Sequence, residues 1–405
     1  MKFNYISQLK VNNCYTHKDF KIPNKSLDTF KHIILTGKNG SGKTTILSRI
    51  HHVLSEIIQK GTLQQDAINK LKRTIHANPN HRNIKSLNER LEKIQDVEIN
   101  FLSPFTSFPP PPKDDIEKTV IYFYKANRKV ELLNVETVTR EDNFISQLKN
   151  GTPNENFTKR LKQYLVNKKV YEAFNYMGSE TEKIKQSQKF FEKLTSALGY
   201  IFEDSSLRLE FVQEEFEFYI ILKDSRRITF NQLSDGFSAF FNIIMDLMIR
   251  IDLIRKIEGD YSLNPKGIVL IDEPETHLHL SLQYNILPII SSLFPNIQLI
   301  IATHSPAIIS SAENAIVYDL TTKEEVSDWI LGSSFSELMI SHFGLDNEYS
   351  PIADEIIEKV NDAVKNKDYD ALNEILENNN KYLTPALRLE IESQIITARN
   401  KEKND

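Results

Sequence analysis

The sequence has a single cysteine, Cys14, among its 405 residues, and this scarcity excludes a class of protein. One thiol cannot close an internal disulfide, and no cysteine or histidine cluster has the spacing of a zinc site. A small disulfide-stabilised domain is therefore excluded. We expect Cys14 to be a small apolar side chain packed at a strand.

Long apolar runs are also missing. No stretch approaches the ~20 apolar residues that a membrane-spanning helix needs. Residues 1–11 alternate apolar and polar side chains, as a strand does, and lack the apolar segment of a signal peptide. We expect a cytoplasmic protein with no membrane partner.

Neither sign of charge is in large excess, since 50 Lys and Arg against 55 Asp and Glu give a formal net charge of -5. Global charge therefore does not predict nucleic-acid binding. Basic stretches do lie at 70–73, 82–93, 159–162 and 168–169. They could bind a phosphate backbone or could be solvated helix faces, so nucleic acid stays open as a partner.

What the sequence does contain begins with a complete phosphate-binding loop at 37–44, GKNGSGKT, between an apolar strand at 32–36 and a helix. Glycines let backbone N–H groups turn towards an anion, and the positive end of the helix points to the same place. We expect Lys43 to reach the β- and γ-phosphates of ATP and Thr44 to ligate Mg²⁺. The other expected nucleotide contacts are Gly37, Asn39, Gly40, Ser41, Gly42 and Thr45.

A second apolar strand, 267–271, is followed at once by Asp272 and Glu273. Ligands of parallel sheets bind at the carboxyl ends of the strands. Asp272 is expected to hold Mg²⁺ through water, and Glu273 to activate the attacking water as a general base. A strand that ends in acidic residues is common in isolation, but the phosphate-binding loop favours the catalytic interpretation.

Two weaker motifs flank this strand. The segment 233–237, LSDGF, opens a long apolar helix, where Ser234 and the backbone N–H of Gly236 could bind a γ-phosphate. Ser234 or Asp235 could instead be a simple helix N-cap. His304 follows the apolar strand 297–302 and could contact the γ-phosphate and the attacking water, although a histidine at a strand end is often structural.

In this order the four motifs resemble the ABC ATPase head shared by transporters, SMC proteins and RecF. The segment 272–279, DEPETHLH, is similar to one branch of that class. The branch contains the ATPases of the overcoming-lysogenization-defect (OLD) type, with AAA15 and AAA21, and relatives in bacterial antiviral systems such as Septu and PARIS. The resemblance implies that Lys43, Glu273 and His304 are catalytic. It implies that Thr44 and Asp272 bind the metal. It also implies that Ser234 and Gly236 contact ATP held by the opposite subunit.

The fold implied by this resemblance is an α/β P-loop NTPase of ABC-ATPase type. Strands alternate with helices after residue 232, which by itself predicts a mostly parallel sheet covered by helices. We expect a discontinuous head at 1–50 and 205–330, a mostly helical insertion at 51–204 and a helical C-terminal extension at 331–405. Within these parts, a strand is expected at 120–124 and a β-hairpin at 207–222.

The resemblance implies an ATP-binding and ATP-hydrolysing homodimer or higher homo-oligomer, with ATP held between two heads. As its biological role we expect the sensor or scaffold subunit of an antiviral system that controls a separately encoded nuclease or toxin. Residues 368–370, DYD, superficially resemble the acidic pair of a Toprim nuclease, but they read as a helix start. The alternatives are a RecF-like DNA-repair ATPase that binds DNA directly, and a transporter ATPase.

Two elements of the ABC head have no clear place in the sequence. The glutamine of the Q-loop is expected near 120–128, and the aromatic partner of adenine is expected at Tyr15 or Phe20.

Overall fold

The computed structural model describes residues 5–60, 64–77, 82–102, 118–126, 132–140, 142–150, 157–326 and 351–396, the last range without 367, 380–381, 386, 390 and 394. The chain forms two compact units, Met1–Ser333 and Ser334–Asp405, and each is described by itself.

The central sheet of the first unit contains six strands among the described residues, in the order β12-β11-β3-β10-β9-β5. The pairs from β11 to β5 are parallel, and β12 runs antiparallel to β11. Strands β3, β9 and β10 are buried along their whole length because helices cover both faces of the sheet. The strands are β3 (His32–Thr36), β5 (Val120–Tyr124), β9 (Gly267–Asp272), β10 (Ile297–Ala302), β11 (Ala315–Asp319) and β12 (Glu324–Glu325). The expected mostly parallel sheet is thereby confirmed.

Two antiparallel sheets accompany the central one. In the first, β1 (Ile6–Cys14) lies between β2 (His17–Ile22) and β4 (Val97–Phe101). In the second, β6 (Arg208–Val212) and β7 (Glu217–Ile221) form the expected hairpin, and β8 (Arg227–Thr229) adds a third strand. Cys14 is fully buried in the main apolar cluster, as expected for an apolar filler.

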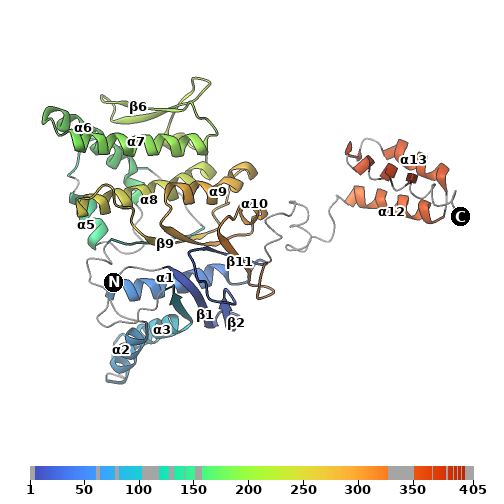
Figure 1. Ribbon diagram of the computed structural model, residues 1–405, viewed down its shortest axis with the longest axis horizontal. Helices are drawn as coiled ribbons and strands as arrows, with labels where there is room; N and C mark the ends of the chain where they lie inside the picture. The colour runs from blue at the N-terminus through green and yellow to red at the C-terminus, as the bar shows by residue number, and fades with distance from the viewer. Residues whose placement is uncertain are drawn as a thin grey trace. The chain divides into compact units, whose positions relative to one another are not determined.

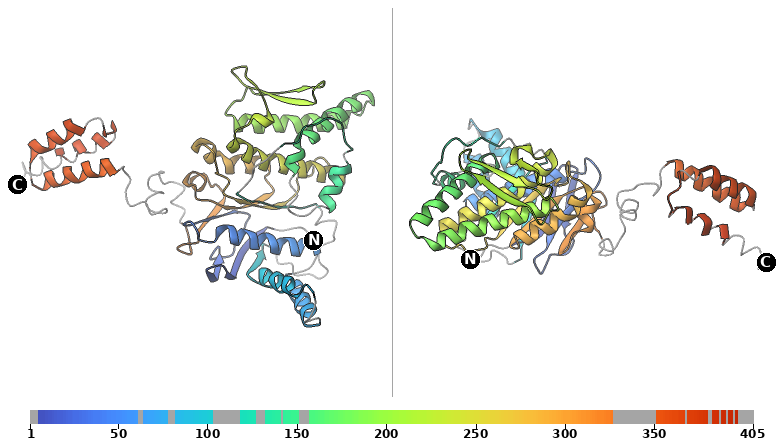
Figure 2. Two further views of the ribbon diagram at one scale, coloured as in Figure 1. Left: turned by 180° about the vertical axis from the view of Figure 1, so that it is seen from behind. Right: turned by 90° about the horizontal axis from the view of Figure 1, so that it is seen from above.

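Helices α1 (Lys43–Lys60) and α8 (Asp235–Glu258) lie on opposite faces of the central sheet, as the front and back views both show (Figures 1 and 2). One face of α1 packs into the core through Ile46, Ile50 and Val53. Nearly every apolar side chain of α8 is buried, because the helix lies between the sheet and a further helical layer. That outer layer contains α6 (Leu161–Met177) and α7 (Thr181–Ile201). The remaining helical elements of residues 157–310 are α9 (Leu280–Leu293), α10 (Pro306–Ser310) and the 3₁₀ turns Phe157–Arg160 and Phe230–Gln232.

The segment 51–204, expected as a mostly helical insertion, supplies strands to two sheets. Its strand β4 pairs with β1 in the first antiparallel sheet, and its strand β5 pairs with β9 in the central sheet. Its helices besides α6 and α7 are α2 (Gln64–Ala77), α3 (Ile84–Gln95) and α5 (Asp142–Asn150). The segment is therefore interleaved in space with residues 1–50 and 205–330.

Several basic residues of the stretches 159–162 and 168–169 are structural. Lys162 is 2% exposed and forms an ion pair of 2.5 Å with Glu217. Lys168 pairs at 2.5 Å with Asp252 of α8. These two cations join α6 to its neighbours through ion pairs with carboxylates of the same chain, so they are not available to bind phosphates.

The second unit contains α12 (Pro351–Lys365), α13 (Tyr369–Asn379) and further helical residues between 385 and 396, around a small apolar core. A carboxylate oxygen of Asp368 accepts a hydrogen bond of 3.0 Å from the backbone N–H of Ala371. The segment 368–370 is thus a capped helix start, as expected. None of the described helices is long and apolar enough to cross a membrane.

Candidate functional site

The phosphate-binding loop connects the carboxyl end of β3 to α1, and its glycines adopt conformations that other residues avoid. Gly37, Gly40 and Gly42 have φ values of 130°, 78° and 86°. A Cβ atom on Gly37 would lie 2.9 Å from the hydroxyl oxygen of Thr321. Glycine is therefore required at Gly37 both by backbone conformation and by space.

The Lys43 side chain lies inside this loop. Its ammonium group donates hydrogen bonds to the carbonyl oxygens of Gly37 (2.8 Å) and Lys38 (3.2 Å) and lies 3.3 Å from the Ser41 hydroxyl. Burial lowers the pKa of Lys43, while the negative charges of the surrounding carboxylates, led by Glu273, oppose that shift. A buried cation encircled by backbone dipoles is suited to a polyphosphate tail.

The Thr44 hydroxyl donates a hydrogen bond of 2.8 Å to a carboxylate oxygen of Asp272, which is 2% exposed at the end of β9. The two residues are 228 positions apart in the chain. A hydroxyl beside a buried carboxylate, next to a phosphate-binding loop, fits Mg²⁺, which takes one or two protein oxygens together with phosphate oxygens and water. The expected metal pair is therefore brought together, and its residues fit the ion.

Glu273 follows Asp272 with a φ of 46°, in the left-handed region that a non-glycine residue seldom adopts. Its backbone N–H donates a hydrogen bond of 2.8 Å to the carbonyl of Ala302, which anchors the turn to β10. Strained backbone of this kind is concentrated at functional sites. The strained backbone of Glu273 determines the direction in which its side chain leaves the edge of the sheet.

His304 is held near the same edge. Burial lowers the pKa of His304, the nearby charge of Lys43 lowers it further, and Glu273 acts in the opposite direction. The three expected catalytic residues, Lys43, Glu273 and His304, are thus within electrostatic range of one another. A histidine with a lowered pKa is neutral near pH 7 and can accept a proton or donate its N–H.

Glu275 positions the histidine and was not predicted. One oxygen of its carboxylate accepts hydrogen bonds from the backbone N–H of His304 (2.7 Å) and the hydroxyl of Thr303 (2.8 Å). Burial raises the pKa of Glu275. The only sequence signal was that Glu275 lies within the DEPETHLH segment, which says nothing of its partners.

A second set of hydrogen bonds that was not predicted connects the phosphate-binding loop to the residues at the end of β11. The Thr321 hydroxyl accepts a hydrogen bond of 2.9 Å from the backbone N–H of Lys38, and the Asp319 carboxylate accepts one of 2.6 Å from the N–H of Thr321. Asp319 is buried. Polar residues directly after a buried strand were the available signal, because β11 is parallel to β3 and ends beside the loop.

Ser234 is exposed at the N-cap position of α8, and its side chain makes no capping hydrogen bond. A purely structural N-cap is therefore not the arrangement observed. Gly236 is buried against the loop after β9, where a Cβ atom would lie 2.1 Å from the carbonyl oxygen of His277. This contact holds the Ser234 turn at the sheet edge that also carries Asp272 and Glu273.

Of the two aromatic candidates for adenine, Tyr15 is 62% exposed and its ring lies against the loop glycine Gly42, with a Cδ1 atom 3.2 Å from the position of a Cβ there. Phe20 is partly buried against the core and is stacked on Tyr318, with ring centroids 5.8 Å apart. Tyr15 is the better placed of the two. The segment proposed for the Q-loop is described only to residue 126, so Asn127 and Arg128 lie outside the described residues.

Residues 33–310 match the family described as "AAA domain, putative AbiEii toxin, Type IV TA system", and the chain belongs to this family. The match spans every motif of the site, from β3 to the residues after His304. The expected kinship with the OLD and AAA21 type of ATPase, in which antiphage-defence proteins occur, is thereby confirmed.

Curated proteins similar to this chain include a Septu protein and two retron ATPases. The "Septu protein PtuA" of Bacillus thuringiensis is 26% identical over 347 residues, which cover 80% of this chain and 81% of that protein. The "Retron Ec83 probable ATPase" of Escherichia coli is 33% identical over 29% of this chain and 23% of its own length. The "Retron Vc95 probable ATPase" of Vibrio cholerae serotype O1 biovar El Tor is 34% identical over 22% of this chain and 18% of its own length.

Among solved structures, an Smc head bound to the C-terminal winged-helix domain of ScpA is 12% identical and aligns over 77% of this chain and 93% of that chain, with a TM-score of 0.36. An Smc head with an extended coiled coil, bound to the C-terminal domain of ScpA derived from Pyrococcus furiosus, is 11% identical over 80% of this chain and 95% of that chain, also with a TM-score of 0.36.

Proposed function

We propose that this chain binds and hydrolyses ATP as an ABC-type ATPase whose complete sites form between two copies. The observation that carries the proposal is the Thr44–Asp272 hydrogen bond of 2.8 Å directly beside the buried ammonium of Lys43. Membership of an AAA family and likeness to two proteins named as probable ATPases support it.

In this proposal the loop residues Gly37, Asn39, Gly40, Ser41, Gly42 and Thr45 hold the nucleotide together with Lys43. Thr44 and Asp272 hold Mg²⁺, which when bound neutralises charge on the phosphate oxygens. Glu273 orients and deprotonates the attacking water, and His304 contacts the γ-phosphate. Glu275 keeps His304 in place through the backbone.

The exposed Ser234 turn supports a site shared between subunits. Its own chain leaves the Ser234 hydroxyl without a capping role, at the N-terminus of a 24-residue helix. A helix N-terminus attracts phosphate. Ser234 and Gly236 would therefore complete the ATP site of a second copy in a homodimer or higher homo-oligomer.

The biological role that we propose is that of sensor or scaffold in a bacterial antiviral system, with a separately encoded nuclease or toxin as the effector and no nuclease activity in this chain. The likeness to a Septu protein over four fifths of both chains supports this assignment. A DNA-repair ATPase of RecF type would instead show DNA-stimulated hydrolysis, and measuring turnover with and without duplex DNA separates the two roles.

The test of the shared site is Glu273→Gln. An amide keeps the shape of the side chain but cannot accept the proton of water, so the variant should bind ATP, fail to turn it over and accumulate as a dimer. Light scattering after size exclusion, with and without ATP and Mg²⁺, measures the dimer. The control is Lys43→Ala, which should bind ATP weakly and stay in its nucleotide-free state; normal turnover by Glu273→Gln would refute the assigned role.

A further inference from the structure

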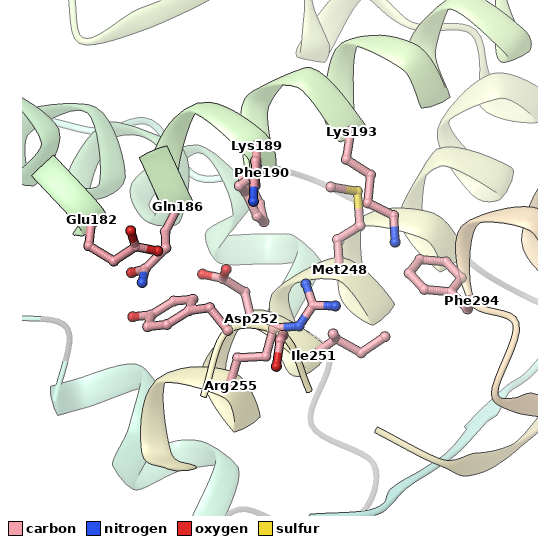
Figure 3. A pocket seen from close by; sticks show the side chains of 12 residues that line it. Glu182, Gln186, Lys189, Phe190, Lys193, Met248, Ile251, Asp252, Arg255 and Phe294 are labelled. Carbon is pink, nitrogen blue, oxygen red and sulfur yellow. The ribbon is translucent and has the colours of Figure 1, made fainter. Parts of the chain in front are cut away.

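A cavity outside the ATP site lies between α7, α8 and the residues that follow α9 (Figure 3). Its volume is about 280 Å³. Lys193 reaches into it from α7, Arg255 from α8, and the ring of Phe294 forms one wall. It shares no lining residue with the ATP site described above.

The two central cations of this cavity bond only to neutral oxygen atoms in the described part of the chain. The Lys193 ammonium donates to the carbonyl of Leu293. The Arg255 guanidinium donates to the carbonyl of Leu263 (2.7 Å) and to the side-chain oxygen of Asn264 (2.8 Å). These bonds position the two cations without neutralising their charge.

The carboxylates that line the cavity do not offset this charge. Asp252 already has a cation of its own, because Lys168 lies 2.5 Å from its Oδ2 atom and the Tyr164 hydroxyl donates to the same oxygen. Glu182 is exposed and lies about two helix turns from Lys189 and about three from Lys193 along α7. Hydrogen bonds from Ser262, and in addition the charge of Arg255, lower the pKa of the exposed Asp260 carboxylate just outside the lining. The cavity and its surroundings thus hold four cations (Lys168, Lys189, Lys193 and Arg255) against three carboxylates (Glu182, Asp252 and Asp260), an excess of positive charge.

The pKa of Lys193 reflects the same imbalance. Burial lowers it first, the positive charge of Arg255 lowers it further, and the result is about 8. Like charges held together in a half-buried space repel each other, and an anion between them removes that repulsion.

We propose that this cavity binds a small organic phosphate whose phosphate group lies between Lys193 and Arg255. Met248, Ile251 and Phe294 line the cavity beside these charges, with the Lys193 ammonium 4.8 Å from the centroid of the Phe294 ring, and this apolar surface fits the carbon part of such a molecule. The volume is several times the roughly 30 Å³ that one water occupies, so there is room for more than a phosphate ion.

The test measures binding to the full chain by titration calorimetry, in a Lys43→Ala background that weakens competing binding at the phosphate-binding loop. The probes are ribose 5-phosphate and inorganic phosphate, each at pH 7.5. Lys193→Gln should weaken the binding of ribose 5-phosphate about tenfold, the effect of losing one charge-assisted hydrogen bond. The matched control is Lys185→Gln, which removes an exposed lysine of the same helix outside the cavity and should leave affinity unchanged.

The pH dependence of the binding affinity gives a second readout, which a lysine with a merely structural role would not affect. A bound anion stabilises the charged form of Lys193, so affinity is full below about pH 8 and falls as the pH rises through that value. The pH series uses ribose 5-phosphate alone, because a phosphate monoester has a second pKa of about 6 and so keeps a nearly constant charge between pH 7.5 and 9.5. The groups that face Lys193 or Arg255, or line the cavity with them, are Asp252, Asp260, Lys189, Glu182 and Tyr261. The fall should be absent from Lys193→Gln.

Lys189→Gln is a further variant, because Lys189 lines the cavity but is exposed, so its replacement should not disturb folding. It should weaken binding less than Lys193→Gln does. Equal affinity for the two probes would overturn the organic part of the proposal. No measurable binding of either, or equal losses in Lys193→Gln and Lys185→Gln, would overturn the site itself. None of these outcomes depends on ATP hydrolysis.

Discussion

A hydrogen atom is the largest group that position 236 accommodates. A Cβ atom there would lie 2.1 Å from the carbonyl oxygen of His277 and 2.7 Å from its carbonyl carbon. Both are backbone atoms, so no side-chain rotation can make room. The contact sets how closely the start of α8 approaches the catalytic loop after β9.

We therefore expect Gly236→Ala to push α8 away from that loop. The overlap should destabilise the fold by about 1–3 kcal/mol, as overpacking does, and should lower ATP turnover more than ATP binding. Urea unfolding and a nucleotide-binding titration measure the two effects. Gly178→Ala is the matched control, since a Cβ there meets nothing closer than 3.6 Å and should leave both quantities unchanged.

At this scale the local motifs were predictable and the partners were not. Lys43, Thr44 and Asp272 could be assigned because a glycine-rich loop and a strand followed by acidic residues have few other uses. Glu275 and Thr321 could not, because their hydrogen bonds to His304 and Lys38 span 29 and 283 positions. Such contacts depend on which strands become neighbours.

Among the elements, Gln298 of β10 joins two sheets and is fully buried. Its side-chain oxygen accepts from the backbone N–H of Ile6 (2.8 Å), and its side-chain nitrogen donates to the carbonyls of Ile6 (2.9 Å) and Lys31 (2.8 Å). The pairing of β1 with β2 begins only at Leu9, so at Ile6 the amide takes the place of the neighbouring strand. It holds the start of β1 against the central sheet.

Gln298→Ala should leave these backbone groups without partners in a buried place. Each unsatisfied group costs about 1–3 kcal/mol, so we expect a loss of at least about 2 kcal/mol in the free energy of unfolding. Chemical denaturation measures it. Gln188→Ala is the control, because its side chain makes only an exposed hydrogen bond to Tyr176; a loss no larger than that of the control would contradict the bridging role.

The helices and strands themselves follow from the sequence for the most part. The strands at 32–36, 120–124 and 297–302 have the bounds expected, since apolar runs with clear breaks mark them. Strand β4 (Val97–Phe101) was not predicted, because five residues after a helix carry little periodicity. The order of strands depends on pairing across the whole chain, which periodicity does not report.

For the whole molecule, the proposed shared site makes a prediction about mixtures. A Lys43→Ala subunit lacks a working phosphate-binding loop but keeps its Ser234 turn, and a Ser234→Arg subunit has the opposite defect. If each ATP is held by both subunits, a mixed dimer contains one intact site. Mixing the two inactive variants should then restore ATP turnover that neither shows alone.

Turnover assays at a series of mixing ratios check this expectation, with activity greatest near equal amounts. Lys43→Ala mixed with Glu273→Gln is the control: if Lys43 and Glu273 serve the same site, each mixed site has one of the two defects and stays inactive. Activity of Ser234→Arg by itself would show that the Ser234 turn takes no part in hydrolysis.

The close contact of Gly236 with His277 also has a consequence for coupling between the two ATP sites of the proposed dimer. The loop that carries Glu273 and the turn offered to a neighbouring copy are in contact at their backbones, so neither can move towards the other without displacing it. A subunit that adjusts its own catalytic loop would carry the docking turn with it. Each event at one nucleotide would then be transmitted mechanically to the other, and the pair would work in concert or in strict alternation, but not independently.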